Sequence, residues 1–267
     1  MTPILPYDYH VHTRYSPDSN ASMDDMVRRA AELGLGEIMF TEHQEYHPLE
    51  RDLCRLRADA WFADIARLNE KYRGRLIIRA GLELGQPHVY AAEARALIDA
   101  YPFDAISGSL HWIGDQNIFG HEYFAARSAE QAYGEYFAEL PRLAAAGGFD
   151  ILTHMDGVKR EGVRCYRRYD IRAYESQVRE TFRGLIANGI ALELNTSGIR
   201  RVSELHPPLA ALRWYREMGG ELITLGSDAH SPGHVAEAFP LALALAREAG
   251  FTRLAAFRRR QIDWIAI

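Results

Sequence analysis

His10 and His12 stand one residue apart in the run YDYHVHT, residues 7–13. Because side chains alternate between the two faces of a β-strand, both imidazoles would point to the same side of such a strand. Imidazole nitrogen is a frequent ligand of Zn²⁺, Fe²⁺ and related ions. The pair could therefore bind one metal ion together. A His-x-His pair also occurs by chance, so this interpretation needs further ligands.

Further metal-competent side chains follow apolar runs elsewhere in the chain. Six of the 11 histidines occur at such places, together with acidic residues. The candidate ligands are His10, His12, Asp18, His43, Glu83, His111, His154, Asp228 and His230. Imidazole and carboxylate without thiolate suit Zn²⁺, Mn²⁺ or Fe²⁺ better than Ca²⁺. The set is too large for one tetrahedral ion, so we expect two or three divalent ions, with Glu83 able to bridge a pair.

Short strands that alternate with helices would position these ligands. Strands are predicted at short apolar, β-rich runs, which occur at 9–11, 37–40, 76–80, 105–106, 151–152, 190–194 and 222–225. Helices are predicted where apolar residues recur with helical periodicity, at 23–33, 53–72, 91–100, 129–146, 173–188, 209–218 and 235–249. Ser22 is expected to cap the first of these helices.

The alternation of strands and helices predicts parallel strands joined by crossovers. Side chains from all the strand ends can meet at one point only if the strands form a closed or nearly closed ring. Barrel enzymes carry their chemistry at the C-terminal mouth of such a ring. We therefore expect an α/β barrel with its metal site at that mouth. No Pro-, Gly- or Ser-rich linker divides the chain, so one domain is expected over residues 1–267.

The charge balance argues against nucleic acid as a partner. The formal net charge is −5 at pH 7, so there is no basic excess to displace phosphate counterions. One concentrated basic run, Arg258-Arg259-Arg260, is expected on a solvated helix face or tail.

Cysteine usage and hydropathy indicate the expected compartment. Cys54 and Cys165 lack the spacing of a thiolate zinc site or a disulfide framework, which favours a reducing cytoplasm. The sequence has no basic segment followed by an apolar run of the kind that opens a secretory signal, and no run approaches the length of a membrane span. We expect neither targeting nor insertion into a membrane.

The candidate ligands fall in short motifs whose order is distinctive. The motifs are HVHT (10–13), TEH (41–43), GLE (81–83), SLH (109–111), THMD (153–156) and GSDAH (226–230). In this order they resemble the motifs of the polymerase and histidinol phosphatase (PHP) superfamily, and the resemblance runs through nearly the whole chain. It implies a distorted (β/α)7 TIM-like barrel with a trinuclear metal site at the C-terminal mouth of the strands.

The resemblance also implies how the ligands are shared among the ions. The first ion would be bound by His10, His12, Glu83 and Asp228. The second would be bound by Glu83, His111 and His154, and the third by Asp18, His43 and His230. Asp18 departs from some related sequences, in which that loop position is histidine.

Two further segments, HMDGVKR (154–160) and ELNTSGIR (193–200), resemble the monofunctional histidinol-phosphate phosphatases. The resemblance implies hydrolysis of L-histidinol phosphate to L-histidinol and phosphate in histidine biosynthesis. A guanidinium group presents a fork of donors that matches phosphate oxygens. Arg160 and Arg200 are therefore the expected phosphate contacts, and their neighbours Lys159 and Arg201 are expected to be ordinary surface residues.

The remaining roles are less restricted by the pattern. Asp228, His230 or a metal-bound water could protonate the leaving oxygen. Candidate contacts to the substrate are Ser197, in the second segment, and Glu45 and Tyr46, after His43. The other histidines are expected at solvent-exposed or capping positions, and they are His47, His88, His121, His206 and His234.

Two alternatives keep different parts of this interpretation. A PHP-type phosphoesterase acting on nucleotides or other small phosphate esters would keep the metals and change the substrate. In a metal-binding or structural module without catalytic activity, some of the metal-binding residues would be replaced. The motifs quoted above retain these residues. Comparing phosphate release from histidinol phosphate, nucleoside monophosphates and an aryl phosphate would distinguish these possibilities.

Overall fold

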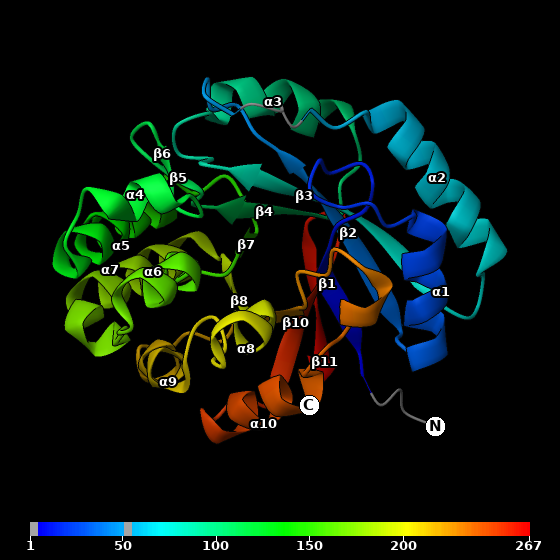
Figure 1. The fold of residues 1–267 in the computed structure, drawn as a ribbon. Helices are drawn as coiled ribbons and strands as arrows, with labels where there is room; N and C mark the ends of the chain where they lie inside the picture. Colours follow the sequence, from blue (N-terminus) through cyan, green and yellow to red (C-terminus); the bar gives the residue numbers. More distant parts are fainter. Residues whose placement is uncertain (1–4, 51–54) are drawn as a thin grey trace.

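The computed structural model describes residues 5–50 and 55–267. Seven parallel strands form one sheet in the order β1-β2-β3-β4-β7-β8-β9 (Figure 1). They are β1 (Tyr7–Val11), β2 (Glu37–Gln44), β3 (Ile77–Gly85), β4 (Ala105–Ser109), β7 (Ile151–Leu152), β8 (Ala191–Asn195) and β9 (Ile223–Gly226). Each coincides with a predicted strand, and several extend a few residues further.

The first and last strands of this sheet approach each other at their C-terminal ends. The backbone N–H of His12 donates to the carbonyl of Ala229 at 2.9 Å, and the N–H of Ala229 donates to the carbonyl of His10 at 3.3 Å. The Asp8 carboxylate accepts the Ser227 N–H at 3.0 Å. These contacts nearly close the ring, which confirms the predicted TIM-like barrel.

Helices surround the strands, as the ribbon shows (Figure 1). They are α1 (Met23–Leu33), α2 (Ala58–Lys71), α3 (Ala91–Ala100), α5 (Ala129–Ala146), α7 (Glu175–Asn188), α9 (Leu209–Glu217) and α10 (Phe239–Glu248). Ser22 caps α1 by accepting the Asp25 N–H at 3.1 Å, as predicted. The helix predicted from residue 53 begins at Ala58, and residues 53 and 54 lie outside the described part of the chain. Among the described helices, none combines the length and apolar character that crossing a membrane requires.

Several short elements were not predicted, and most of them follow the C-terminal ends of strands. They are β5 (Trp112–Ile113), β6 (Gln116–Asn117), α4 (His121–Ala125), α6 (Lys159–Tyr166), η1 (Ile171–Tyr174), α8 (Ser197–Val202) and η2 (Pro232–His234). Each is too short to show a periodic pattern in the sequence. Together they build the loops above the mouth of the barrel.

A β-hairpin of β10 (Arg253–Arg258) and β11 (Gln261–Ala266) ends the described chain. The Tyr7 hydroxyl donates to the Ala255 carbonyl at 2.5 Å, and the Arg260 guanidinium binds the Asp150 carboxylate at 2.8 Å. Tyr7 begins β1 and Asp150 directly precedes β7, so the hairpin lies at the N-terminal end of the barrel. Arg258–Arg260 are exposed, as expected of a solvated helix face or tail, but they are not helical, because they end β10 and form the hairpin turn.

We expect this hairpin to contribute much of the stability of that end of the barrel. Phe257 on β10 is buried, so Phe257→Ala should lower the free energy of unfolding by about 3–5 kcal/mol through lost contacts and a new cavity. Trp264 on β11 is 41% exposed, so Trp264→Ala should cost less than about 1 kcal/mol. Urea denaturation of both variants tests this, and equal losses would show that the hairpin does not pack as described.

Candidate metal centre

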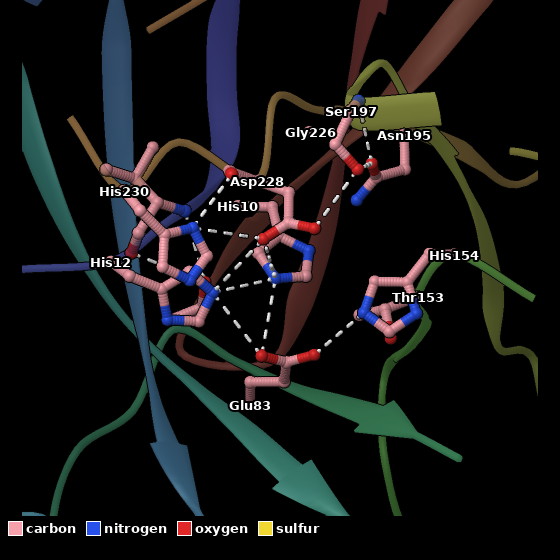
Figure 2. Close-up of polar contacts among 12 residues, drawn as sticks. His10, His12, Glu83, Thr153, His154, Asn195, Ser197, Gly226, Asp228 and His230 are labelled. Atoms are coloured by element: carbon pink, nitrogen blue, oxygen red, sulfur yellow. Dashed lines mark hydrogen bonds and ion pairs between the residues drawn. The ribbon is translucent and has the colours of Figure 1, made fainter. Parts of the chain in front are cut away.

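The predicted ligands converge at the C-terminal mouth of the barrel around Glu83 of β3 (Figure 2). The Glu83 carboxylate is buried, and imidazole nitrogens from four strands or their loops lie near it. The nitrogen–oxygen distances are 3.4 Å for His10, 3.3 Å for His12, 2.9 Å for His43, 3.3 Å for His111 and 3.0 Å for His154. The nearly closed ring thus brings together side chains that are far apart in the sequence.

His10 and His12 have the geometry of two metal ligands. Their Nε2 atoms lie 3.0 Å apart. Nδ1 of His10 lies 2.6 Å from Glu193 Oε1, and Nδ1 of His12 lies 3.1 Å from Ser16 Oγ, so hydrogen bonding assigns the ring protons to Nδ1. The two Nε2 atoms then face each other, and a cation between them, either a proton or a metal ion, offsets the repulsion of their lone pairs. Metal-binding histidines commonly donate their other N–H to such a partner.

Glu83 and His43 supply a second indication that the cluster suits cations. Glu83 Oε2 and His43 Nδ1 are both buried and have no hydrogen-bond partner among the described residues, although they lie only 2.9 Å apart. Buried polar atoms of this kind are costly unless an ion or water satisfies them. The His111 ring is oriented in the same way as that of His10. Its Nδ1 bonds a carboxylate oxygen, Glu45 Oε1, at 2.6 Å, and its Nε2 faces Glu83. The donor set therefore fits divalent metal ions.

Asp18 lies in the loop after β1 and joins the outer edge of the cluster. One of its oxygens is 2.9 Å from Nε2 of His230 and 3.3 Å from Nε2 of His43. The Asp18 side chain is 52% exposed. Burial opposes its ionisation, but hydrogen bonds from His230 and His43 hold the pKa of the Asp18 carboxyl well below its ordinary value. A cation here would be the one nearest to solvent.

The ligand atoms form overlapping sets of three, within which all atoms lie within 4.8 Å of one another. The sets are His10–His12–Glu83, His43–Glu83–His111, His12–His43–His230 and His10–His154–Asp228. The first set is part of the group expected for the first ion. The others place His43 beside Glu83 and His154 beside Asp228, so the division of ligands among ions stays a prediction.

Glu83 and His12 are held in metal-binding protonation states, whereas burial opposes protonation of His10 and His43 but neighbouring carboxylates raise the pKa of both imidazoles. Burial opposes ionisation of Glu83, but His43 and His10 hold the pKa of its carboxyl well below the ordinary value. Burial and the neighbouring rings of His230 and His43 lower the pKa of the His12 imidazole well below its ordinary value. At neutral pH Glu83 is therefore ionised and His12 is neutral, which are the forms that bind metal.

Glu193 of β8 was not identified as part of the site from the sequence. It accepts hydrogen bonds from Nδ1 of His10 at 2.6 Å, from the backbone N–H of His154 at 2.7 Å and from the side chain of Asn195 at 3.0 Å. Glu193 is buried and thereby links ligands of two strands. The sequence does carry one signal for this role, which is a single carboxylate within the otherwise apolar predicted strand 190–194.

Arg160 of α6 reaches over the cluster. Its guanidinium donates to Asp228 Oδ2 at 2.5 Å and to Ser197 Oγ at 2.7 Å. The Ser197 hydroxyl also donates to Asp228 Oδ2 at 3.1 Å. Asp228 follows β9 with a φ of 53°, in the left-handed region that non-glycine residues seldom adopt. These contacts fix its side chain at the centre of the mouth.

Two buried residues, His206 and Asp156, hold the Arg160 side chain in position through a chain of hydrogen bonds. Nε of Arg160 donates to Nε2 of His206 at 3.4 Å, and Nδ1 of His206 lies 2.7 Å from Asp156 Oδ1. Lys159 Nζ lies 2.8 Å from the other oxygen of Asp156. Both His206 and Lys159 are fully buried, so the predictions of exposed or surface positions for them are wrong. Buried charges that satisfy one another leave no simple pattern in the sequence.

The cluster opens into a cavity of about 650 Å³. Residues that line it include Asp18, Glu45, Glu50, Phe119, Arg160, Glu161, Arg164 and Arg201. Neither Arg200 nor Tyr46 is among the lining residues. Arg200 instead binds Glu237 Oε2 at 2.7 Å, and Tyr46 packs under the Arg55 guanidinium. Successive helical residues are rotated by about 100°, so Arg201 rather than Arg200 faces the cavity.

Comparison with known proteins identifies the family. The PHP domain model matches residues 8–197. The chain belongs to the PHP family. This PHP-family chain is 31% identical to the histidinol-phosphatase of Lactococcus lactis subsp. lactis, with 96% of each chain covered. It is 27% identical to the histidinol-phosphatase of Bacillus subtilis, covering 87% of this chain and 96% of that one.

A solved structure agrees with the fold of this PHP-family chain. The crystal structure of histidinol phosphate phosphatase from Lactococcus lactis, complexed with zinc, L-histidinol and phosphate, matches with a TM-score of 0.86 and 28% identity. The match covers 97% of this chain and 98% of that chain. The expected resemblance and fold are therefore confirmed. The PHP model ends before β9, and one domain over residues 1–267 stays a prediction.

We expect the buried His206 to make stability depend on pH. Burial lowers the pKa of the His206 imidazole to about 3. Between about pH 6.5 and 4.5 the unfolded chain binds a proton at this residue and the folded chain does not, so the free energy of unfolding should fall by up to about 1.4 kcal/mol per pH unit. His206→Gln removes this group. Chemical denaturation across this range should show a shallower slope in the variant, and parallel curves would contradict the prediction.

Proposed function

We propose that the chain is a metal-dependent phosphomonoesterase that hydrolyses L-histidinol phosphate to L-histidinol and phosphate. The observation that carries the proposal is the cluster of imidazoles and carboxylates at the barrel mouth, open to a cavity that arginines also line. The Lactococcus lactis relative, whose structure contains zinc, L-histidinol and phosphate, supports the same substrate. Hydrolysis of nucleotides or other small phosphate esters is the alternative.

Two or three divalent ions would be held by the predicted ligands. Zinc suits the imidazole and carboxylate donors, and Mn²⁺ or Fe²⁺ would use the same atoms. When bound, such ions act as Lewis acids toward the phosphate and lower the pKa of coordinated water. The third ion, at Asp18, His43 and His230, would be bound more weakly than the others, because the Asp18 side chain is 52% exposed.

Arginine side chains would bind and orient the phosphate. Arg160 already bonds Asp228 beside the cluster, and Arg164 and Arg201 line the same cavity. Their guanidinium groups present donors that match the oxygens of a phosphate dianion. Such donors stabilise charge on those oxygens during in-line displacement. In this arrangement Arg201 takes the role first expected of Arg200.

Asp228 and His230 differ in how well they could donate a proton to the leaving oxygen. Burial opposes ionisation of Asp228, but Arg160 and His10 hold the pKa of its carboxyl well below the ordinary value, so it stays ionised and suits binding a cation better than donating a proton. Burial opposes protonation of His230, but its hydrogen bond with Asp18 raises the pKa of its imidazole. His230 could protonate the leaving oxygen only while Nε2 carries a proton rather than a metal ion. This links its role to the occupancy of the third site.

Acidic side chains would recognise the cationic part of the substrate. Histidinol phosphate carries an ammonium and an imidazole, and Glu45, Glu50 and Glu161 line the cavity. Glu45 Oε2 is buried and has no hydrogen-bond partner in the described part of the chain, so an N–H of the substrate could bind it. Tyr46 stays a candidate only if its loop moves, since it does not line the cavity. The cytoplasmic location expected from cysteine usage stays a prediction.

A substrate panel tests the proposal. With Zn²⁺ or Mn²⁺ present, kcat/KM for L-histidinol phosphate should exceed that for AMP and p-nitrophenyl phosphate by about 100-fold or more, because the acidic cavity contributes only to the cationic substrate. A chelator should abolish phosphate release, and added metal should restore it. Equal slow turnover of all three esters would favour the alternative function. Activity that survives complete metal removal would contradict both.

The two neighbouring arginines of α8 provide a matched comparison. Arg201→Ala should weaken inhibition by inorganic phosphate by about 10- to 100-fold, the usual effect of losing a hydrogen bond to a charged group. Arg200→Ala should weaken it much less, because Arg200 binds Glu237 outside the cavity lining. The exposed Arg168→Ala, which breaks only a surface ion pair, serves as the control. The opposite order would restore Arg200 as the phosphate contact.

A further inference from the structure

A second group of possible metal ligands lies outside the catalytic cluster. It consists of His121, the first residue of α4, with Glu161 and Cys165, one helical turn apart on α6. Cys165 Sγ lies 3.8 Å from His121 Nδ1 and 3.8 Å from Glu161 Oε1. These three residue types come from two helices and point at one another, so the group is more than an isolated thiol.

The separations match those of ligands around one ion. Zinc binds sulfur at about 2.3 Å and nitrogen or oxygen at about 2.0–2.1 Å, so tetrahedral angles place a sulfur and a nitrogen ligand about 3.6 Å apart. The two observed separations of 3.8 Å need only a small contraction. All three ligand atoms lie within 4.8 Å of one another. A fourth position would be left for water.

The surroundings hold two of these ligands in place. The second oxygen of Glu161 accepts a hydrogen bond from Arg164 at 3.0 Å, which leaves Oε1 facing the thiol. Tyr166, the residue after Cys165, donates its hydroxyl to the backbone carbonyls of Phe124 and Arg127 at 3.0 and 2.9 Å. These bonds tie α6 to the end of α4. The two helices therefore present their ligands from a fixed relative position.

The charges also suit a divalent ion. A thiolate and a carboxylate would neutralise a dication, and the neutral imidazole would complete the set. Burial and the nearby Glu161 carboxylate raise the pKa of the Cys165 thiol, so the thiol keeps its proton unless a cation displaces it. A thiolate ligand selects zinc or cadmium over magnesium or manganese.

We propose that His121, Glu161 and Cys165 form a peripheral binding site for zinc or a similar thiophilic divalent ion. The site is separate from the catalytic cluster, and the proposal does not rest on the proposed function. Glu161 also lines the catalytic cavity, so an ion bound here would stand in the wall of that cavity. It would join α4 to α6 and draw the Glu161 carboxylate toward the thiol.

Reactivity of the thiol tests this site without reference to activity. The protein, carrying its catalytic metals, is treated with iodoacetamide, and alkylation of Cys165 is followed by peptide mass spectrometry. Micromolar Zn²⁺ should slow alkylation at least about tenfold, because a coordinated thiolate is no longer a free nucleophile. A chelator should reverse the protection, and Mg²⁺ should give none.

Variants distinguish coordination from general shielding. His121→Ala and Glu161→Gln should each abolish the protection, whereas His234→Ala, which removes a histidine outside the group, should keep it. In a Cys54→Ser background, which keeps all three proposed ligands, Cd²⁺ should give a thiolate charge-transfer absorption band. The additional substitution Cys165→Ser should remove this band. Unchanged alkylation with Zn²⁺, protection that needs millimolar Zn²⁺, or protection that survives His121→Ala would overturn the proposal.

Discussion

A buried carboxylate surrounded by imidazoles governs this structure. Glu83 lies within 3.4 Å of ring nitrogens from β1 and β2 and from the loops after β1, β4 and β7, and its Oε2 has no hydrogen-bond partner within residues 5–50 and 55–267. An ionised group in such a place requires compensating positive charge. The imidazole rings can reach the Glu83 carboxylate only if the C-terminal ends of their strands lie at the same level along the barrel axis. The parallel, nearly closed sheet meets this requirement, because all its C-terminal ends face one mouth.

The two ends of the barrel serve different purposes. At one end the hairpin β10–β11 packs against the strand beginnings, with the Tyr7 hydroxyl on the Ala255 carbonyl. At the other end short helices follow the strands and carry the arginines of the cavity wall. Stability and chemistry are thus largely carried by separate residues. Such a division is usual for barrels of this kind.

Patterns in the sequence located the strands and the cluster because both are local signals. A short apolar run followed by His43 or by His154 can be recognised without knowing the fold. The direction in which a side chain points could not be predicted in the same way. Arg200 and Arg201 are adjacent, and only the pitch and position of the short helix α8 decide which of them lines the cavity. The sequence alone predicts a surface position for Lys159, because it does not show that the buried Asp156 carboxylate lies beside the ammonium group.

Glu193 has a consequence for how the centre assembles. One carboxylate holds the ring of His10 through one oxygen and the backbone of His154 through the other. Gly226 permits this, since a Cβ there would lie 2.1 Å from a Glu193 oxygen. Two candidate metal ligands from different strands are therefore held by one carboxylate. Metal binding at either residue would therefore favour the binding-competent position of the other, because the Glu193 carboxylate couples the two.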